Sequence, residues 1–263
     1  MIKQLYDLSL QQTYYDRAAA HANQFCQFGK KVFSQSDEDG LTLEIISRLD
    51  LSAGTFMEFG VGNGLQNNTL VLLAMGWEGA WFGNEDLVID VKRGSRLSYT
   101  KTWITAENVL ATAQAELPRF GNGNVDLISL DLDGNDLYIV KKLLRSKLRP
   151  KVFIVEYNQK FPPPLRFCIP YDPNFSWTGD DFFGASLCSM NDAFVAEGYR
   201  AVCCNAWTGV NAFFIEEKYF HLFPDTPEKI EDIYSSPCLF LPVIRRQATS
   251  RRTVEMIINS QTP

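Results

Sequence analysis

Residues 55 to 64 read Thr-Phe-Met-Glu-Phe-Gly-Val-Gly-Asn-Gly, an apolar segment that runs through Glu58 into glycines at positions 60, 62 and 64. The apolar part predicts a buried strand. The glycines predict a sharp turn, because a residue without Cβ adopts positive φ angles and allows a ligand to approach the backbone closely. The N-terminus of a following helix would add unpaired N–H groups. We therefore predict a strand, turn and helix that hold a ligand; a tight turn with a purely structural purpose is the alternative.

The spacing of these glycines excludes two nucleotide-binding loops. A dinucleotide fingerprint requires its third glycine where this chain has Leu65, and a phosphate-binding P-loop requires Gly-Lys-Ser/Thr, which is absent here. A strand that ends in E-x-G-x-G-x-G instead resembles the first motif of class I methyltransferases that depend on S-adenosylmethionine (SAM).

The length of the chain bounds its organisation. Its 263 residues are enough for one large α/β domain with a sizeable core, and no Pro/Gly/Ser-rich linker divides them. We predict a single methyltransferase domain over 1–263. It would comprise an N-terminal helical segment (1–50), a SAM-binding half (51–160) and an acceptor-side half (161–263).

Composition excludes several classes of partner. No apolar run approaches the roughly 20 residues of a membrane span, and the N-terminus lacks the apolar core of a signal peptide, so we expect a soluble, cytoplasmic protein without a membrane span. The net charge of −6 and the lack of a basic stripe argue against a nucleic acid partner. The Arg245/Arg246 and Arg251/Arg252 pairs are interpreted as a solvated face or tail. None of the six cysteines forms a C-x-x-C pair, and Cys203 and Cys204 are expected in the core.

Helical and strand-like apolar patterns alternate along the chain. After a polar, helical N-terminal segment we expect helices over 37–49, 70–75, 109–117, 137–148 and 185–197. We expect strands over 55–59, 80–83, 103–104, 125–130, 152–155, 199–205 and 211–216. Helical connections imply parallel strands, and the short turn at 206–209 implies a hairpin. The predicted fold class is α/β: a Rossmann-like, mostly parallel seven-stranded sheet with a C-terminal antiparallel hairpin, as in class I methyltransferases. Five prolines between 162 and 173 predict an irregular excursion after Asn158.

Ligands of open α/β sheets bind outside the carboxyl ends of the strands, so the residues that follow each apolar run are candidates. They are mostly acidic or amide: Glu58; Asn84, Glu85 and Asp86; Asp131, Asp133 and Asp136; Glu156, Tyr157 and Asn158. We predict that Glu85 accepts the ribose hydroxyls, since a carboxylate can accept two hydrogen bonds; a solvated loop acid is the alternative. Glu58 either fixes the glycine loop through backbone N–H groups or attracts the amino acid part of SAM.

The acids after the strand at 125–130 are the most specific cluster. Three carboxylates within six positions repel one another unless solvent, hydrogen bonds or a cation offsets their charge. With the neighbouring strand end they offer hard oxygen ligands for Mg²⁺ or Ca²⁺, the candidates being Asp131, Asp133, Asp136, Glu156 and Asn158. The arrangement resembles that of catechol O-methyltransferase and the macrocin-type sugar methyltransferases. Alternatively, Asp133 and Asp136 cap the helix that follows.

Several segments together resemble the FkbM-like SAM-dependent methyltransferases. They are Phe33-Ser-Gln-Ser-Asp-Glu-Asp-Gly, the glycine motif with Asn67-Asn68-Thr69, Asp126-Leu-Ile-Ser-Leu-Asp-Leu-Asp-Gly-Asn-Asp, Val155-Glu-Tyr-Asn, Phe183-Gly-Ala-Ser-Leu and Asn211-Ala-Phe-Phe. The resemblance implies SAM as cofactor and O-methylation, often of a sugar. The acidic run after the strand is longer than the family's, which weakens any residue-by-residue transfer of catalytic roles. We assign cofactor binding to Gln35, Glu58, Gly60, Gly62, Gly64, Thr69, Asn84, Glu85, Thr105, Ala106, Asn108 and Asp131.

The general base is not a histidine in our interpretation, because His21 and His221 both lie outside the predicted strand ends. Asp133 and Glu156 are the catalytic candidates. The acceptor is expected to contact Tyr157, Asn158, Lys160 and Trp207, since aromatic rings with polar neighbours suit carbohydrate.

The sequence thus predicts a SAM-dependent O-methyltransferase, with or without Mg²⁺, whose acceptor is a saccharide or a glycosylated small molecule. Two alternatives stay open: a nucleoside-binding or scaffold protein of the same fold without chemistry, and an NAD-dependent oxidoreductase, which Leu65 and the final hairpin disfavour. Homo-oligomerisation stays open as well.

Overall fold

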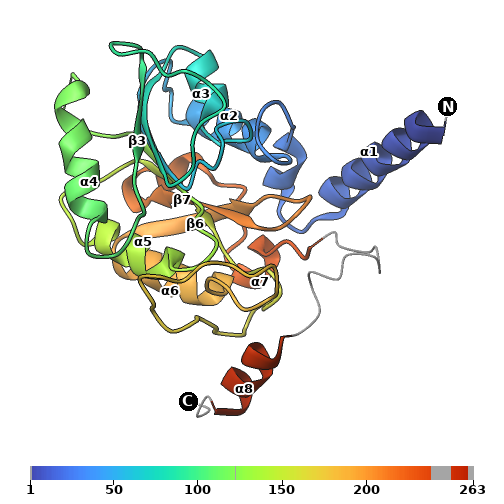
Figure 1. Cartoon of the computed structure of the whole chain (residues 1–263). Coiled ribbons are helices and arrows are strands. Elements are labelled where there is room, and N and C mark those ends of the chain that lie inside the picture. Colours follow the sequence, from blue (N-terminus) through green and yellow to red (C-terminus); the bar gives the residue numbers. More distant parts are fainter. Residues whose placement is uncertain (1, 122, 238–249, 260–263) are drawn as a thin grey trace.

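A computed structural model describes residues 2–121, 123–237 and 250–259 of the chain. Its centre is a seven-stranded sheet (Figure 1) with the strand order β3-β2-β1-β4-β5-β7-β6. The strands are β1 (Thr55–Phe59), β2 (Glu78–Gly83), β3 (Leu97–Lys101), β4 (Leu127–Leu130), β5 (Val152–Glu156), β6 (Tyr199–Cys204) and β7 (Asn211–Glu216). The α-helices are α1 (Ile2–Ala20), α2 (Glu38–Arg48), α3 (Leu70–Ala74), α4 (Val109–Glu116), α5 (Asp136–Leu144), α6 (Leu187–Ala196), α7 (Ile230–Ile233) and α8 (Arg251–Asn259). The described residues also include the 3-10 helices η1 (Gln24–Phe28), η2 (Leu117–Arg119) and η3 (Glu217–Leu222).

Strand direction confirms the predicted fold class. The first five strands pair in parallel, whereas β7 inserts antiparallel between β5 and β6. The sheet is therefore Rossmann-like with an antiparallel pair at one edge, and the carboxyl ends of β1, β2, β4 and β5 lie along one edge of the sheet.

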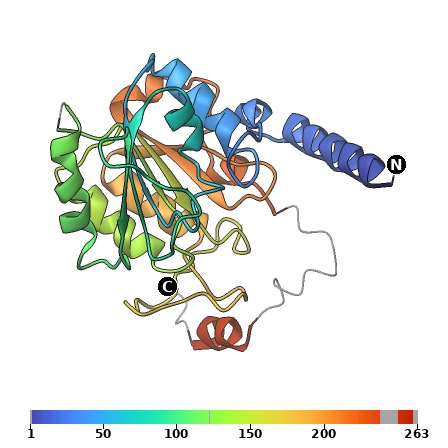
Figure 2. The same cartoon turned by 45° about the horizontal axis from the view of Figure 1, so that its top comes forward.

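Helices cover both faces of the sheet (Figures 1 and 2), because the inner strands are apolar on both sides. In β5, Phe153 and Val155 face a core with α4, α5 and α6, while Val152 and Ile154 face a core with α2 and α3. Cys203 and Cys204 are fully buried core residues, as predicted.

One predicted strand was wrong. The third strand is Leu97–Lys101 rather than Trp103 and Ile104. It is an edge strand in which only Leu97 is buried. Its mainly polar sequence therefore lacks the apolar pattern by which a strand is predicted. Trp103 and Ile104 come after the strand and line a cavity at its end.

The segments outside the sheet layers differ in how they are held. Helix α1 projects away from the sheet in both views (Figures 1 and 2). The proline-rich excursion contains no helix or strand over 157–186, as expected, apart from one isolated bridge between Cys168 and Ala185. Cys238 and the Arg245/Arg246 pair lie outside the described residues. Among the helices that are described, none has the length and apolar character needed to cross a bilayer.

Candidate functional site

Two adjoining cavities lie at the carboxyl ends of the parallel strands. The larger has a volume of about 520 Å³ and the smaller about 240 Å³. Both are lined by the same five residues, Gly60, Gly62, Asp131, Asp133 and Trp177. The two cavities therefore form one cleft that crosses the glycine turn after β1, which is the turn where we predicted a ligand site from the sequence.

The glycine turn brings β1 close to β4. Gly60 has φ +88°, and a Cβ there would lie 1.6 Å from the carbonyl oxygen of Asp131, so no other residue fits without moving the backbone. Gly62 has φ +49° but faces open space in the cleft. Gly64 (φ +87°) packs near Leu87 and does not line either cavity. The first two glycines thus shape the cleft directly, whereas the third shapes the turn.

Glu58 holds the loop that follows the glycines. Its Oε1 accepts the N–H of Asn68 at 2.9 Å, and its Oε2 accepts the N–H and hydroxyl of Thr69 at 3.1 and 2.5 Å. Burial raises the pKa of Glu58, while these hydrogen bonds act in the opposite direction. Of the two roles foreseen for Glu58, the structure shows the loop-fixing one.

Thr69, which we predicted as a cofactor contact, lies away from the cleft. It is fully buried, and its hydroxyl also accepts the indole N–H of Trp81 at 2.9 Å. It lines neither cavity. Thr69 therefore helps to fix the start of α3.

We expect Glu58→Gln to lower the free energy of unfolding by about 1–3 kcal/mol, because the glutamine amide would direct N–H groups at the donors of Asn68 or Thr69. Urea denaturation measures this difference. Glu78→Gln, at an exposed position, is the control and should change the value by less than about 0.5 kcal/mol. Equal stability of the two variants would contradict the loop-fixing role.

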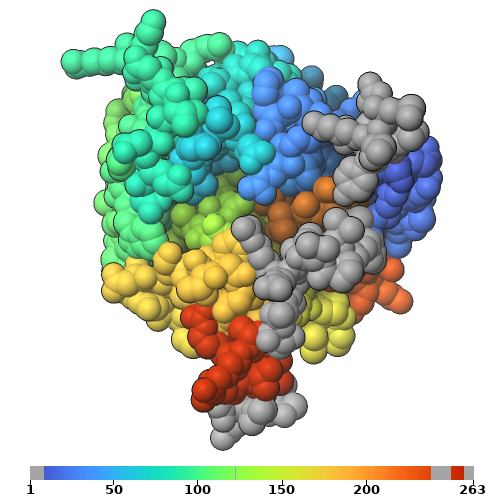
Figure 3. All heavy atoms as spheres, turned by 45° about the vertical axis from the view of Figure 1, so that its right-hand side comes forward, coloured from blue at the N-terminus to red at the C-terminus, as the bar shows by residue number. Residues whose placement is uncertain are grey.

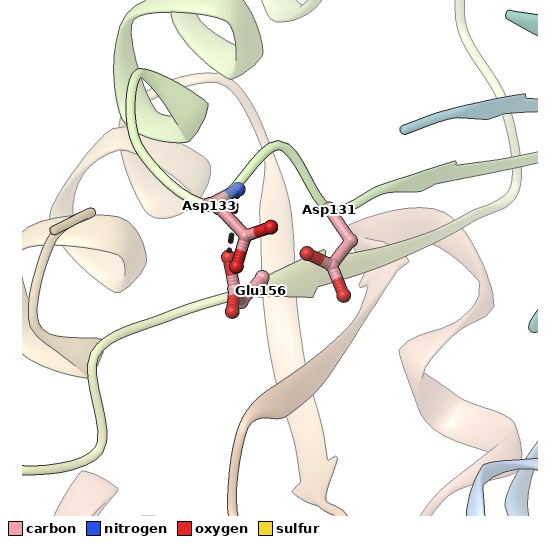
Figure 4. Close-up of side chains that lie close together, drawn as sticks. All are labelled: Asp131, Asp133 and Glu156. Carbon is pink, nitrogen blue, oxygen red and sulfur yellow. Dashed lines mark hydrogen bonds between the residues drawn. The ribbon is translucent and has the colours of Figure 1, made fainter. Parts of the chain in front are cut away.

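Three carboxylates meet at the centre of the cleft (Figure 4). One carboxylate oxygen from each of Asp131, Asp133 and Glu156 lies within 4.8 Å of the other two. Asp133 has φ +55°, and its N–H donates to Glu156 at 3.2 Å. Adjacent β4 and β5 place these residues together, as strand pairing predicted.

The electrostatics of the three acids favour protons or a cation. Burial raises the pKa values of Asp131 and Glu156 well above their ordinary range, and repulsion from the neighbouring carboxylates, Asp133 and Asp136 among them, adds to the effect. The side chain of Asp133 is exposed, yet the protein around it displaces part of its hydration and raises its pKa as well. Three oxygen ligands whose negative charges require a nearby positive charge fit a hard divalent cation.

Two other residues predicted as metal ligands have different partners. Asp136 is buried, and its carboxylate accepts the N–H groups of Leu132 and Gly134 at 2.8 and 2.9 Å, so it fixes the loop before α5. Burial raises its pKa to about 6. Asn158 donates to the carbonyls of Asp181 and Phe183, and its own oxygen accepts the N–H of Lys160. Both residues support the walls of the cleft instead of offering free ligand atoms.

The smaller cavity lies at the ends of β2 and β3. Asn84 and Glu85, two of the predicted cofactor contacts, line it with exposed side chains. Thr105, Ala106 and Asn108 do not. The side-chain oxygen Oδ1 of Asn108 accepts the N–H of Thr105, and the N–H of Ala106 donates to the hydroxyl of Tyr171. Thr102, Trp103 and Ile104 line it instead. We did not predict them as site residues because we had placed the third strand at 103–104.

The predicted acceptor residues separate into three places. Asn158 and Lys160 line the larger cavity, and the Lys160 ammonium donates to Asp181 at 2.5 Å. Tyr157 is fully buried in the core, so the prediction that it contacts the acceptor was wrong. Trp207 lines a separate groove. Gln35 lines both that groove and the larger cavity.

The excursion forms one wall of the cleft through Trp177, Asp180 and Asp181. It is anchored at one side by the indole of Trp103, which donates to the Pro173 carbonyl at 2.7 Å. At the other side α8 holds it: Arg252 pairs with Asp180 at 3.1 Å, and Thr253 donates to Asp181 at 2.8 Å. Figure 3 shows α8 (red) against the excursion (yellow). Arg252 thus combines a contact to the excursion with an exposed side chain, and Arg251 beside it is exposed as well, in keeping with the solvated face expected for this pair.

Several polar residues of the larger cavity were missed. Asn67, Gln159, Thr208 and Asn211 line it. Asn67 and Asn211 belong to the sequence motifs that resemble the FkbM-like family, and their place in those motifs could have identified them as site residues. Gln159 and Thr208 lie in irregular segments whose path the sequence does not reveal.

No family model matches the chain, and no curated protein matches it. Cofactor-bound Rv0187 from MTB has a TM-score of 0.42 at 14% identity, over 74% of this chain and 86% of that chain. The MycE methyltransferase of the mycinamycin pathway, in complex with Mg, S-adenosylhomocysteine (SAH) and mycinamycin VI, has 0.40 at 11%, over 81% and 58%. An O-methyltransferase family protein from Burkholderia thailandensis has 0.37 at 11%, over 79% and 69%. Likenesses this distant identify neither cofactor nor substrate for this chain.

Proposed function

We propose that this protein is a SAM-dependent O-methyltransferase that methylates a hydroxyl of a saccharide or a glycosylated small molecule. The observation that carries the proposal is the continuous cleft across the Gly60–Gly62 turn, with Asp131, Asp133 and Glu156 at its centre. The strand order and the sequence motifs support the same assignment.

The two cavities suit the two parts of the reaction. The smaller one, with the Glu85 carboxylate and the Trp103 ring at its walls, suits a nucleoside. The larger one is lined mainly by amides, carboxylates and Lys160, which suits the amino acid part of SAM and a hydroxyl-rich acceptor. The methyl group would pass where the cavities join.

The chemistry assigned to the chain is an in-line displacement. The acceptor oxygen forms a bond to the methyl carbon as the carbon–sulfur bond breaks, the bond pair stays on sulfur, and the sulfonium becomes the thioether of SAH. The acceptor hydroxyl loses its proton as its oxygen attacks. Asp133 is the base we assign, because it is exposed in the cleft and its raised pKa favours proton uptake; Glu156 is the second candidate.

A divalent cation fits the same acids. Asp131, Asp133 and Glu156 would hold it, and when bound it would lower the pKa of an acceptor hydroxyl. The half-buried Asp131 carboxylate and the buried Glu156 carboxylate both have raised pKa values where three acids meet, and this is the observation that supports Mg²⁺.

The first experiment is isothermal titration calorimetry with SAH, with and without Mg²⁺, and with NAD as the comparison. Micromolar SAH binding supports the proposal and leads to a screen of saccharide acceptors with labelled SAM. Binding of NAD alone would favour an oxidoreductase. SAH binding without methyl transfer to any acceptor would favour a scaffold, and absence of SAH binding would end the methyltransferase assignment.

The stability of the metal-free protein should fall as pH rises above about 4 toward the raised pKa values of the three acids. In that window the folded state holds more protons than the unfolded chain, so each rise in pH favours unfolding. Mg²⁺ competes with those protons and should therefore raise Tm more at about pH 8 than at about pH 5. Thermal melts after chelation, with and without Mg²⁺, test this; an equal Mg²⁺ effect at both pH values would contradict it.

A further inference from the structure

A groove of about 490 Å³ lies beside the cleft, between α1, the segment 29–37 and the turn between β6 and β7. Three aromatic side chains, Tyr14, Tyr15 and Trp207, line it together with polar groups that include Gln35 and Ser36. Tyr15 is 52% exposed. Aromatic faces beside amides and hydroxyls are what a sugar ring requires, since its C–H faces are apolar and its edges polar.

One buried carboxylate fixes the aromatic rings from two different elements. The oxygens of Asp37 accept the N–H groups of Ala206 and Trp207 at 2.9 and 3.2 Å. The hydroxyl of Tyr14 lies 3.4 Å from the same carboxylate, and the rings of Tyr14 and Trp207 meet edge to face at 5.8 Å. The groove is therefore built in advance of any ligand.

A glycine makes this close packing feasible. A Cβ at Gly29 would lie 2.1 Å from the Tyr14 hydroxyl oxygen and 2.7 Å from the Asp37 carboxylate. A larger residue at this position would have to displace the Tyr14 hydroxyl and the Asp37 carboxylate from their present places.

The groove and the cleft share a wall. Gln35 lines both, and the consecutive residues Trp207 and Thr208 line the groove and the larger cavity respectively. The hydroxyl oxygens of Ser36, in the groove, and Thr208, in the cleft, are 3.5 Å apart. A ligand longer than one ring that is seated in the cleft would pass over Gln35 into the groove.

We infer that the groove of Tyr14, Tyr15 and Trp207 is a second saccharide subsite, which takes the sugar units flanking the one methylated in the cleft. This inference rests on the proposed function and narrows its acceptor to a saccharide chain. Trp207 does not line the cleft, and in the groove its ring supplies the face on which a sugar stacks. Gln35 lines both sites.

The five tryptophans of the chain allow both sites to be observed at once. Trp103 and Trp177 line the cleft, Trp207 lines the groove, and Trp77 and Trp81 are buried. The full chain labelled with 5-fluorotryptophan, with signals assigned by Trp→Phe variants, is followed by ¹⁹F NMR. The probes are SAH, ladders of glucan, chitin and galacturonan oligomers from the monosaccharide to the hexasaccharide, and tyrosine-containing peptides for comparison.

We expect a longer oligomer to shift the Trp177 and Trp207 signals together and a monosaccharide to shift Trp177 alone. Trp207→Ala should weaken binding of the longer oligomer about tenfold and change SAH affinity by less than about twofold, while Trp207→Phe should restore most of the loss. Tyr15→Ala should act in the same direction.

The inference is overturned if no oligomer shifts Trp207, or if oligomers that shift Trp177 leave Trp207 unchanged at every length. A Trp207 shift caused by tyrosine-containing peptides and by no saccharide would assign the groove to a protein partner and also overturn it. A Trp207 shift by oligomers in a protein that does not bind SAH would retain the subsite and remove the proposed methyl transfer, so the two failures are distinguishable.

Discussion

Gly60→Ala is expected to lower the free energy of unfolding by about 3 kcal/mol or more and to abolish SAH binding. The new methyl group would overlap the Asp131 carbonyl, a backbone atom at the end of a buried strand, and alanine at φ +88° is strained. For a chain of this length that corresponds to a fall in Tm of about 6–12 °C. Thermal melts and calorimetry with SAH measure the two effects.

Gly62→Ala is the matched control for this variant. It also has positive φ, but the methyl group meets no atom within 4 Å, so the loss of stability should stay near about 1 kcal/mol. Because Gly62 lines the cleft, SAH affinity should still fall. A Gly60→Ala protein with the wild-type Tm would contradict the close approach of β1 and β4. A Gly62→Ala protein with wild-type SAH affinity would show that the cofactor does not touch the turn.

The sequence predicted those parts of the site that lie on regular elements. Asp131 follows one buried apolar strand and Glu156 ends the next, and strands of this kind pair in parallel, so their meeting could be foreseen. Gly60 could be foreseen because its spacing after a strand implies a positive φ angle.

What could not be foreseen depends on side-chain direction and on irregular segments. Tyr157 and Asn158 directly follow the same strand, yet one side chain enters the core and the other fixes the excursion. The position of Trp207 depends on a hydrogen bond from its backbone N–H to the buried Asp37 carboxylate, which lies 170 positions earlier in the chain. No periodic pattern carries such information.

The misplaced third strand had a physical cause with a functional consequence. An edge strand needs few apolar residues, so Leu97–Lys101 gave a weak pattern, while Trp103 and Ile104 are apolar because they line the smaller cavity. The error moved the predicted cofactor contacts a few residues along the chain, to Thr105, Ala106 and Asn108.

Asp133→Asn is expected to reduce turnover about 100-fold or more and to change SAH affinity by less than about threefold. The substitution removes the charge and the proton-accepting oxygen. It adds little backbone strain, because asparagine tolerates the φ of +55° found at this position as well as aspartate does. The fold should therefore persist, and the N–H that binds Glu156 is retained.

Asp180→Asn is the control for this experiment, since it removes another carboxylate from the cleft wall, one paired with Arg252. It should retain turnover within about threefold. Equal loss of turnover and SAH affinity in Asp133→Asn would contradict a role confined to chemistry.

The Mg²⁺ dependence of turnover then distinguishes the two roles assigned to Asp133, metal ligand and general base. If its main duty is to hold the cation, excess Mg²⁺ restores much of the turnover; if it accepts the proton, turnover stays low at every Mg²⁺ concentration, because no added cation replaces the missing base.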